Sequence, residues 1–178
     1  MMSGLQTALR KLWVDHIVWT RSYIAAAVAG APDAGAAATR LLKNQEDIGN
    51  AIIPVYGRAA GARLTELLKE HIMIAVDLIA SAKAGDMVKF QEYDMKWTKN
   101  VEDIATFLSD ANPMHWPRKD VVDLLMLHLN LTKKEVMARL NQKWEEDVMA
   151  FDDIFTEIMT VADTLADGIH KQFPGKVT

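Results

Sequence analysis

Residues 67–71 (LLKEH) and 97–104 (WTKNVEDI) decide the fold, because the chain holds two further, imperfect copies of this pair. One copy precedes it, at 12–16 (LWVDH) and 41–48 (LLKNQEDI), and one follows it, at 124–128 (LLMLH) and 151–158 (FDDIFTEI). The histidines that end the first members are 55 and 57 residues apart. A fixed spacing of this kind indicates a repeated supersecondary unit that needs its neighbours to bury its apolar face.

The pattern of apolar residues predicts helices along the whole chain. Apolar spacings of three and four recur, and no run alternates for long with a period of two. We therefore predict an all-α fold: an up-down helical bundle of three tandem hairpins with a period of about 56 residues. The hairpins are expected at about 3–55, 60–110 and 117–173, within one domain that spans 1–178.

Two capping boxes refine the expected helix limits. Ser3 with Gln6 predicts the start of the first helix, and Thr132 with Glu135 predicts a new start after a short helix that ends near residue 130. Gly85 is expected as a left-handed cap, followed by Asp86 as the cap of the next helix.

Composition narrows the classes of function. The chain has no cysteine, which excludes disulfides and thiolate sites and fits a reducing compartment. With 24 acidic and 20 basic residues, the net charge of −4 predicts no nucleic-acid partner and no anionic membrane surface. The start of the chain lacks the pattern of a signal peptide, and no apolar run is long enough to span a bilayer, so a cytoplasmic protein is expected.

The sharpest feature is a histidine in the apolar stripe of the first helix of each expected hairpin: His16, His71 and His128. At about 100° per residue, Asn100 falls inside the apolar stripe of its helix and Asp103 at the edge. Asn44 has the matching place in the first copy, whereas Ile154 takes it in the third. Because buried polar groups need partners, we predict a polar seam of histidine and asparagine that fixes helix register. Its members are His16, Asn44, His71, Asn100 and His128.

A metal site is the alternative. Imidazoles from neighbouring helices can converge in a bundle core, with carboxylates completing the shell. The candidate ligands are His16, His71, His128, Asp47 and Asp103. None of these histidines belongs to a Glu-x-x-His motif, which is typical of di-iron bundles. The residues three positions before them are Trp13, Leu68 and Leu125.

Several short motifs resemble a family of small, uncharacterised, all-helical bacterial proteins. They are Leu12-Trp13-x2-His16-x2-Trp19-Thr20-Arg21, Leu41-Leu42-x-Asn44, Lys69-Glu70-His71, Ala82-Lys83-Ala84-Gly85-Asp86, Ala111-Asn112-Pro113 and Gly168-Ile169-x2-Gln172-Phe173-Pro174. The likeness covers nearly the whole length and implies a helical bundle, with no catalytic residues to transfer. Some members carry automatic names such as glycosyltransferase or acetylglutamate kinase, which no residues here support.

The sequence thus favours a non-enzymatic binding or interaction protein with a buried polar seam, with a redox-active metal-binding bundle as the alternative. No known nucleophile or phosphate-binding motif occurs in the chain, and nothing identifies a substrate. The cofactor is therefore either none or a transition metal. A small ligand and a homo-oligomer remain open as partners.

Overall fold

A computed structural model describes residues 4–175, which form seven helices joined by short turns and contain no strand. The all-α prediction is therefore confirmed for this range. The helices are α1 (Gly4–Ala29), α2 (Ala34–Ala51), α3 (Ile53–Tyr56), α4 (Arg58–Ala84), α5 (Met87–Ala111), α6 (Arg118–Leu140) and α7 (Trp144–Gln172).

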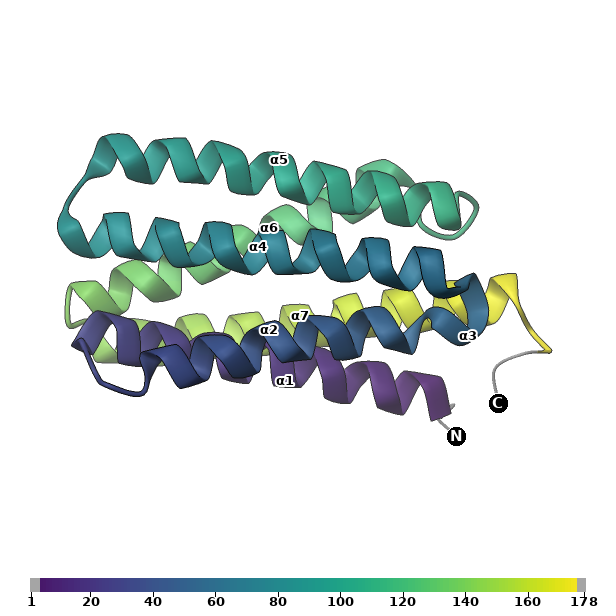
Figure 1. Ribbon diagram of the computed structural model, residues 1–178, viewed down its shortest axis with the longest axis horizontal. Helices are drawn as coiled ribbons and strands as arrows, with labels where there is room; N and C mark the ends of the chain where they lie inside the picture. The colour runs from purple at the N-terminus through teal and green to yellow at the C-terminus, as the bar shows by residue number, and fades with distance from the viewer. Residues whose placement is uncertain (1–3, 176–178) are drawn as a thin grey trace.

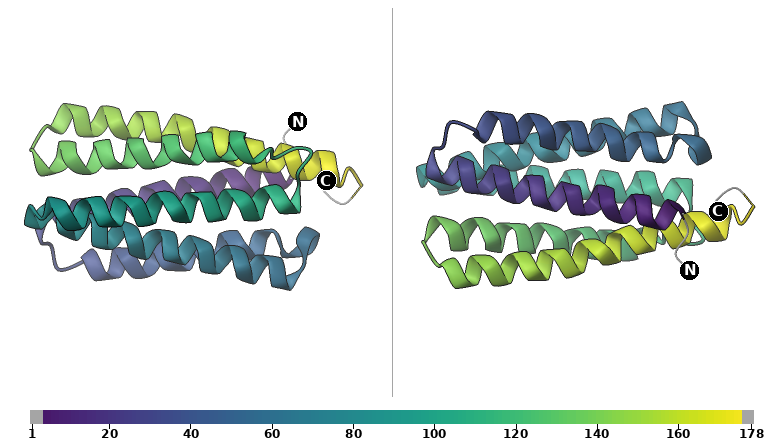
Figure 2. Two further views of the ribbon diagram at one scale, coloured as in Figure 1. Left: turned by 90° about the horizontal axis from the view of Figure 1, so that it is seen from above. Right: turned by 90° about the horizontal axis from the view of Figure 1, so that it is seen from below.

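The six long helices form three antiparallel hairpins, α1 with α2, α4 with α5 and α6 with α7 (Figure 1). The hairpins also pack on one another, α2 on α4, α5 on α6 and α7 on α1, which closes a ring of helices (Figure 2). In addition, α1, α4 and α6 contact one another. These are the three helices that carry the buried histidines, so the ring places the histidines near its centre.

Turn chemistry explains where the helices end. Gly85 has φ 70°, a left-handed conformation that glycine adopts at little cost, and it ends α4 as expected. The Asp86 carboxylate then accepts a hydrogen bond from the Lys89 backbone N–H at 3.1 Å and caps α5. The helix start expected at Ser3 lies outside the described residues.

The expected break near residue 130 is wrong. Helix α6 runs without interruption through this point, and Thr132 Oγ1 donates to the His128 carbonyl one turn earlier, at 2.9 Å. A threonine inside a helix can bond back in this way instead of capping a new helix. Glu135, expected as the other half of the cap, is buried and bonded to Arg21 of α1.

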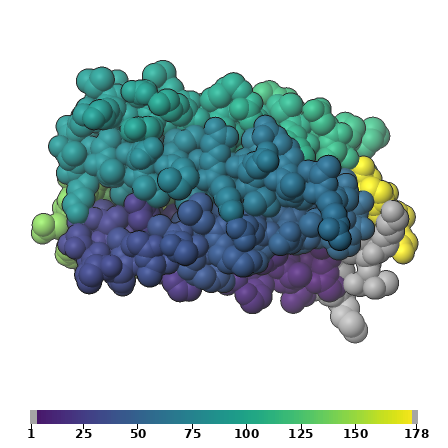
Figure 3. Space-filling model, in the orientation of Figure 1, coloured from purple at the N-terminus to yellow at the C-terminus, as the bar shows by residue number. Residues whose placement is uncertain are grey.

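Close packing holds the hairpins together. A Cβ atom added at Gly49 of α2 would lie 2.6 Å from the Gly61 carbonyl of α4, so only glycine permits this crossing. On the face seen in Figure 3, side chains of α4 and α5 cover the upper half and those of α1 and α2 the lower half.

Within the described range, no helix combines the length and apolar character that a membrane span requires.

Candidate functional site: a buried three-histidine cluster

The imidazoles of His16, His71 and His128 lie together in the core. Their ring centres are 5.5 Å apart for His16 and His128 and 6.4 Å apart for each of the other two pairs. The three residues are 2%, 6% and 5% exposed. Helices α1, α4 and α6 each contribute one ring, so all three hairpins build the cluster.

His71 pairs with Asn100 of the neighbouring helix in its hairpin. Nδ1 of His71 lies 2.9 Å from Asn100 Oδ1, and Asn100 Nδ2 donates to the Leu67 carbonyl at 3.0 Å. Because the amide oxygen only accepts, His71 must carry its proton on Nδ1. A neutral His71 therefore presents a lone pair at Nε2, on the other side of the ring.

In the first hairpin, Asn44 and Gln45 share the two contacts that Asn100 makes alone in the second hairpin. Asn44 Nδ2 donates to the Leu12 carbonyl at 2.9 Å, the counterpart of the bond from Asn100 to Leu67. However, Nδ1 of His16 lies 3.2 Å from Nε2 of Gln45, not from Asn44. The expected His16–Asn44 pair is therefore corrected to His16–Gln45.

The third hairpin supplies a carboxylate. Nδ1 of His128 lies 2.8 Å from Glu157 Oε2, and both side chains are almost fully buried. Ile154, which occupies the expected asparagine position, is a buried core residue. Thus the third histidine also has a polar partner, Glu157, which lies three residues after the expected position.

The three pairs share one spacing that sequence reasoning missed. Gln45, Asn100 and Glu157 each follow their histidine by 29 residues. When the three copies are matched at their asparagine position, the first copy points to Asn44 and the third to Ile154. The residues that contact the histidines in these two copies are instead Gln45 and Glu157. A search for any polar residue at a constant distance from each histidine would have found all three.

The proposed carboxylate ligands lie elsewhere. Asp47 accepts a hydrogen bond from Lys43 at 2.5 Å, and Asp103 is bonded to Lys99, each pair lying along the outside of its own helix. Neither carboxylate joins the histidine cluster. Among residues 4–175, no group of three or more His, Cys, Asp or Glu side chains could hold a metal ion.

The core keeps two of the histidines neutral. Burial, together with the nearby His128, lowers the pKa of His71 to about 3, although the bond to Asn100 opposes the shift. Burial also lowers the pKa of His16 well below its usual value, with smaller contributions from His128 and His71. At neutral pH these two rings therefore offer nitrogen lone pairs rather than positive charge.

Cavities adjoin the cluster. One, of about 50 Å³, is lined by the three histidines and by apolar side chains that include Leu68, Val161 and Ile169. Another, of about 20 Å³, also has the three histidines in its wall, together with Trp97. A space of about 10–15 Å³ is enough for one water-sized probe, so the larger cavity has room for a ligand of a few atoms.

Polar atoms without partners gather around the histidines. In the described part of the chain, five buried side-chain nitrogen or oxygen atoms lack a hydrogen-bond partner, and four of them belong to residues that touch a histidine of the cluster. These four are Trp13 Nε1, Gln45 Oε1, Trp97 Nε1 and Glu157 Oε1. Such atoms are rare in folded proteins, and each one needs an explanation.

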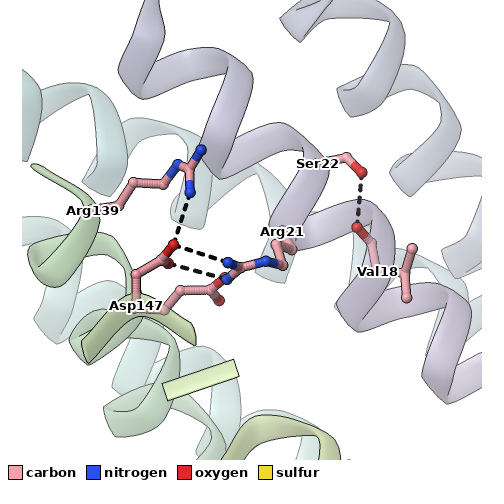
Figure 4. Close-up of polar contacts among 6 residues, drawn as sticks. Val18, Arg21, Ser22, Arg139 and Asp147 are labelled. Atoms are coloured by element: carbon pink, nitrogen blue, oxygen red, sulfur yellow. Dashed lines mark hydrogen bonds and ion pairs between the residues drawn. The ribbon is translucent and has the colours of Figure 1, made fainter. Parts of the chain in front are cut away.

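A second buried polar group connects α1 with the third hairpin. Arg21 binds both oxygens of Asp147, at 3.1 and 2.9 Å, and is also bonded to Glu135. Arg139 donates to Asp147 at 2.8 Å (Figure 4). Burial raises the pKa of Glu135 to about 7, although Arg21 lowers it. We name these four residues the arginine–carboxylate network.

Comparison with known proteins does not identify the chain. No protein-family model, curated protein or solved structure matches it. The resemblance noted from the motifs therefore stays an expectation, and the function must be argued from the site itself.

Proposed function

We propose that this chain is a non-catalytic binding protein that holds a small ligand in its core, at the three-histidine cluster. The observation that carries the proposal is the gathering of unpaired buried polar atoms around the histidines, two of which, Trp13 Nε1 and Trp97 Nε1, belong to residues that line the adjoining cavities. An unpaired buried polar group costs about 1–3 kcal/mol, so a ligand that pairs with such groups gains affinity there.

The cavity limits what the ligand can be. Its lining is almost wholly apolar apart from the histidines, so it favours a molecule with little polar surface and one group that can reach an imidazole. At about 50 Å³ it is much smaller than the engineered cavity of about 150 Å³ that binds benzene. We therefore expect an uncharged ligand of a few non-hydrogen atoms.

The structural alternative explains less. Histidine–amide pairs that only fixed helix register would satisfy their own polar atoms, as His71 and Asn100 do at Nδ1 and Oδ1. In contrast, Gln45 and Glu157 each leave one oxygen unpaired beside their histidine. The pairs can fix helix register and also bind a ligand. Fixing helix register does not by itself account for the unpaired atoms.

Native mass spectrometry of the purified full chain, combined with xenon binding followed by NMR, tests the proposal. We expect a bound mass that denaturation removes, and xenon-dependent shifts at Val161 and neighbouring cavity residues. Val161→Leu fills the cavity and should abolish the xenon shifts, whereas the matched Val136→Leu, in the separate cluster around Ile24 and Ile79, should retain them. A bare chain that takes up no xenon would overturn the proposal.

A further inference from the structure

We propose that an exposed apolar stripe along α1 and α7 is a docking surface for an amphipathic helix of a partner protein, one whose apolar face is flanked by lysine or arginine. The stripe lies on the outside of the bundle, so this inference goes beyond the proposed function and does not rest on it. Its members are large apolar side chains that are 43%, 51%, 53% and 43% exposed in turn: Val18, Trp144, Val148 and Phe155. We name these four residues the α1–α7 stripe.

Three members of the α1–α7 stripe share one side of α7. At about 100° per residue, with Trp144 as zero, Val148 falls at about 40° and Phe155 at about 20°. The half-buried Phe151 lies beside them at about −20°, and the core residue Ile154 falls at about −80°. Single exposed apolar residues are ordinary on a protein surface, whereas a row of them beside the buried face of a helix is typical of an interaction site.

Contacts between the two helices place Val18 of α1 beside this row. Arg21 binds Asp147 and lies over the Phe151 ring, 4.8 Å from its centre, so α1 follows the edge of the row. Since the two helices pack together and run in opposite directions (Figure 1), Val18 lies further along α7 than Arg21, near the level of Phe155. The stripe therefore spans both helices over about three turns, or roughly 16 Å.

The rim of the stripe is acidic. Glu145 and Asp152, both exposed on α7, fall at about 100° and 80°, on the side of the stripe that faces solvent. Within residues 4–175, neither carboxylate forms an ion pair or a hydrogen bond. On α1, one turn before Val18, Asp15 is paired with Lys11 at 2.5 Å, so this part of the rim carries no net charge. The rim as a whole is therefore negative and favours a cationic partner.

Shape and charge together favour one kind of partner. A helix with apolar residues at i, i+3, i+4 and i+7 can lay them along a stripe of this length, and its basic flanks then meet Glu145 and Asp152. A second copy of this chain would bring the same net-negative rim and not the complementary charge. An anionic membrane surface would be repelled by the rim for the same reason.

Fluorescence anisotropy of a labelled synthetic peptide, titrated with the full chain, tests the inference. The peptide is a helix of about 18 residues, which covers the stripe with a turn to spare at each end, and it has leucine on one face and lysine on both flanks. We expect the wild type to bind it and Phe155→Ala to weaken binding about tenfold, because an aromatic anchor is lost. The matched control is Met95→Ala, which truncates an exposed apolar side chain on α5 and should leave binding unchanged.

A reversal of charge gives a second test. In the double variant Glu145→Lys/Asp152→Lys the rim becomes positive. A peptide with the same leucine face and glutamate flanks should then bind more tightly than the lysine peptide, which is the reverse of the order expected for the wild type. Circular dichroism checks that each variant is folded.

Several outcomes would overturn the inference. One is equal binding of the two peptides to the wild type, and another is an affinity for the lysine peptide that Phe155→Ala leaves unchanged. A dimer in sedimentation that Phe155→Ala dissociates would show that a second copy covers the stripe. Binding to vesicles of phosphatidylcholine and phosphatidylglycerol that Phe155→Ala abolishes would show that a membrane does. Xenon uptake and bound mass report on the core, so the proposed function stands or fails separately.

Discussion

The histidine cluster and the arginine–carboxylate network are both buried polar groups, but they differ in charge and in completeness. The network joins cationic to anionic groups, and each of its carboxylates is bonded to at least one arginine. The histidine cluster has two neutral imidazoles and is surrounded by unpaired polar atoms. A complete buried network is typical of a structural role, whereas an incomplete one needs a further explanation, which the proposed ligand would supply.

The largest effect should come from removing the cation at the centre of the network. Arg21→Met leaves Glu135 without its arginine partner and Asp147 with Arg139 alone. Breaking a buried ion pair by removing one partner typically costs about 3–5 kcal/mol, and we expect about 3 kcal/mol here because Glu135 can take up a proton. Urea unfolding at pH 7 measures the loss. Arg63→Met, which removes an exposed pair with Glu66, is the matched control.

Stability of Arg21→Met within measurement error of the wild type would show that the network contributes nothing to holding α1 on the third hairpin. It would also remove the contrast between the two buried groups.

The next effect concerns the histidine pair that is complete. His71→Leu leaves Asn100 Oδ1 without its donor and should lower the free energy of unfolding by about 1–3 kcal/mol. The double variant His71→Leu/Asn100→Leu should recover part of this loss, because replacing both partners by apolar groups can be nearly neutral. Thermal and urea unfolding of the single and double variants measure the coupling. An unchanged melting transition of His71→Leu would contradict the expectation.

Most of the fold could be predicted from periodicity, but only part of the site. The spacing of His16, His71 and His128 placed one histidine on each hairpin because apolar stripes and turns leave few alternatives. The partners were harder to find, since a difference of one residue, between Asn44 and Gln45, changes which side chain meets the ring. That choice depends on how two helices are rotated against each other, which sequence periodicity does not determine.

Glu135 shows the same limit in another way. Its position three residues after Thr132 fits a helix cap, yet α6 continues through both residues. The side chain instead crosses to Arg21, more than a hundred residues away in sequence. Local sequence patterns compete with tertiary contacts of this kind. No local pattern predicts that α1 lies beside α6 and α7.

Acid should weaken the fold through the histidine cluster and not through the network. His16 and His71 have folded pKa values below the unfolded value of about 6.5, so below that pH the unfolded chain binds two protons that the folded chain does not. Glu135 opposes this, because with a folded pKa of about 7 it is protonated in the folded chain before the unfolded one. These three groups together predict a loss of about 1.4 kcal/mol per pH unit between about pH 6.5 and 4.5.

Urea unfolding at a series of pH values measures this slope, and two variants test its origin. His71→Leu removes one of the two histidine contributions, so the slope from the remaining pair should fall to about zero. Glu135→Gln removes the opposing contribution and should roughly double the slope. A slope that neither variant changes would show that other groups control the acid response.

The smallest effect on stability should come from a change at Asp103, one helical turn after Asn100 on α5. Asp103→Asn removes an exposed carboxylate bonded to Lys99 and should leave the free energy of unfolding within about 0.5 kcal/mol of the wild type. Asn100→Asp makes the reverse change on the same helix, three residues earlier, but it buries a charge and removes the donor to the Leu67 carbonyl. It should destabilise the fold by about 1–3 kcal/mol. Urea unfolding of the two variants places the boundary of the site. A loss of stability in Asp103→Asn as large as that in Asn100→Asp would contradict this boundary.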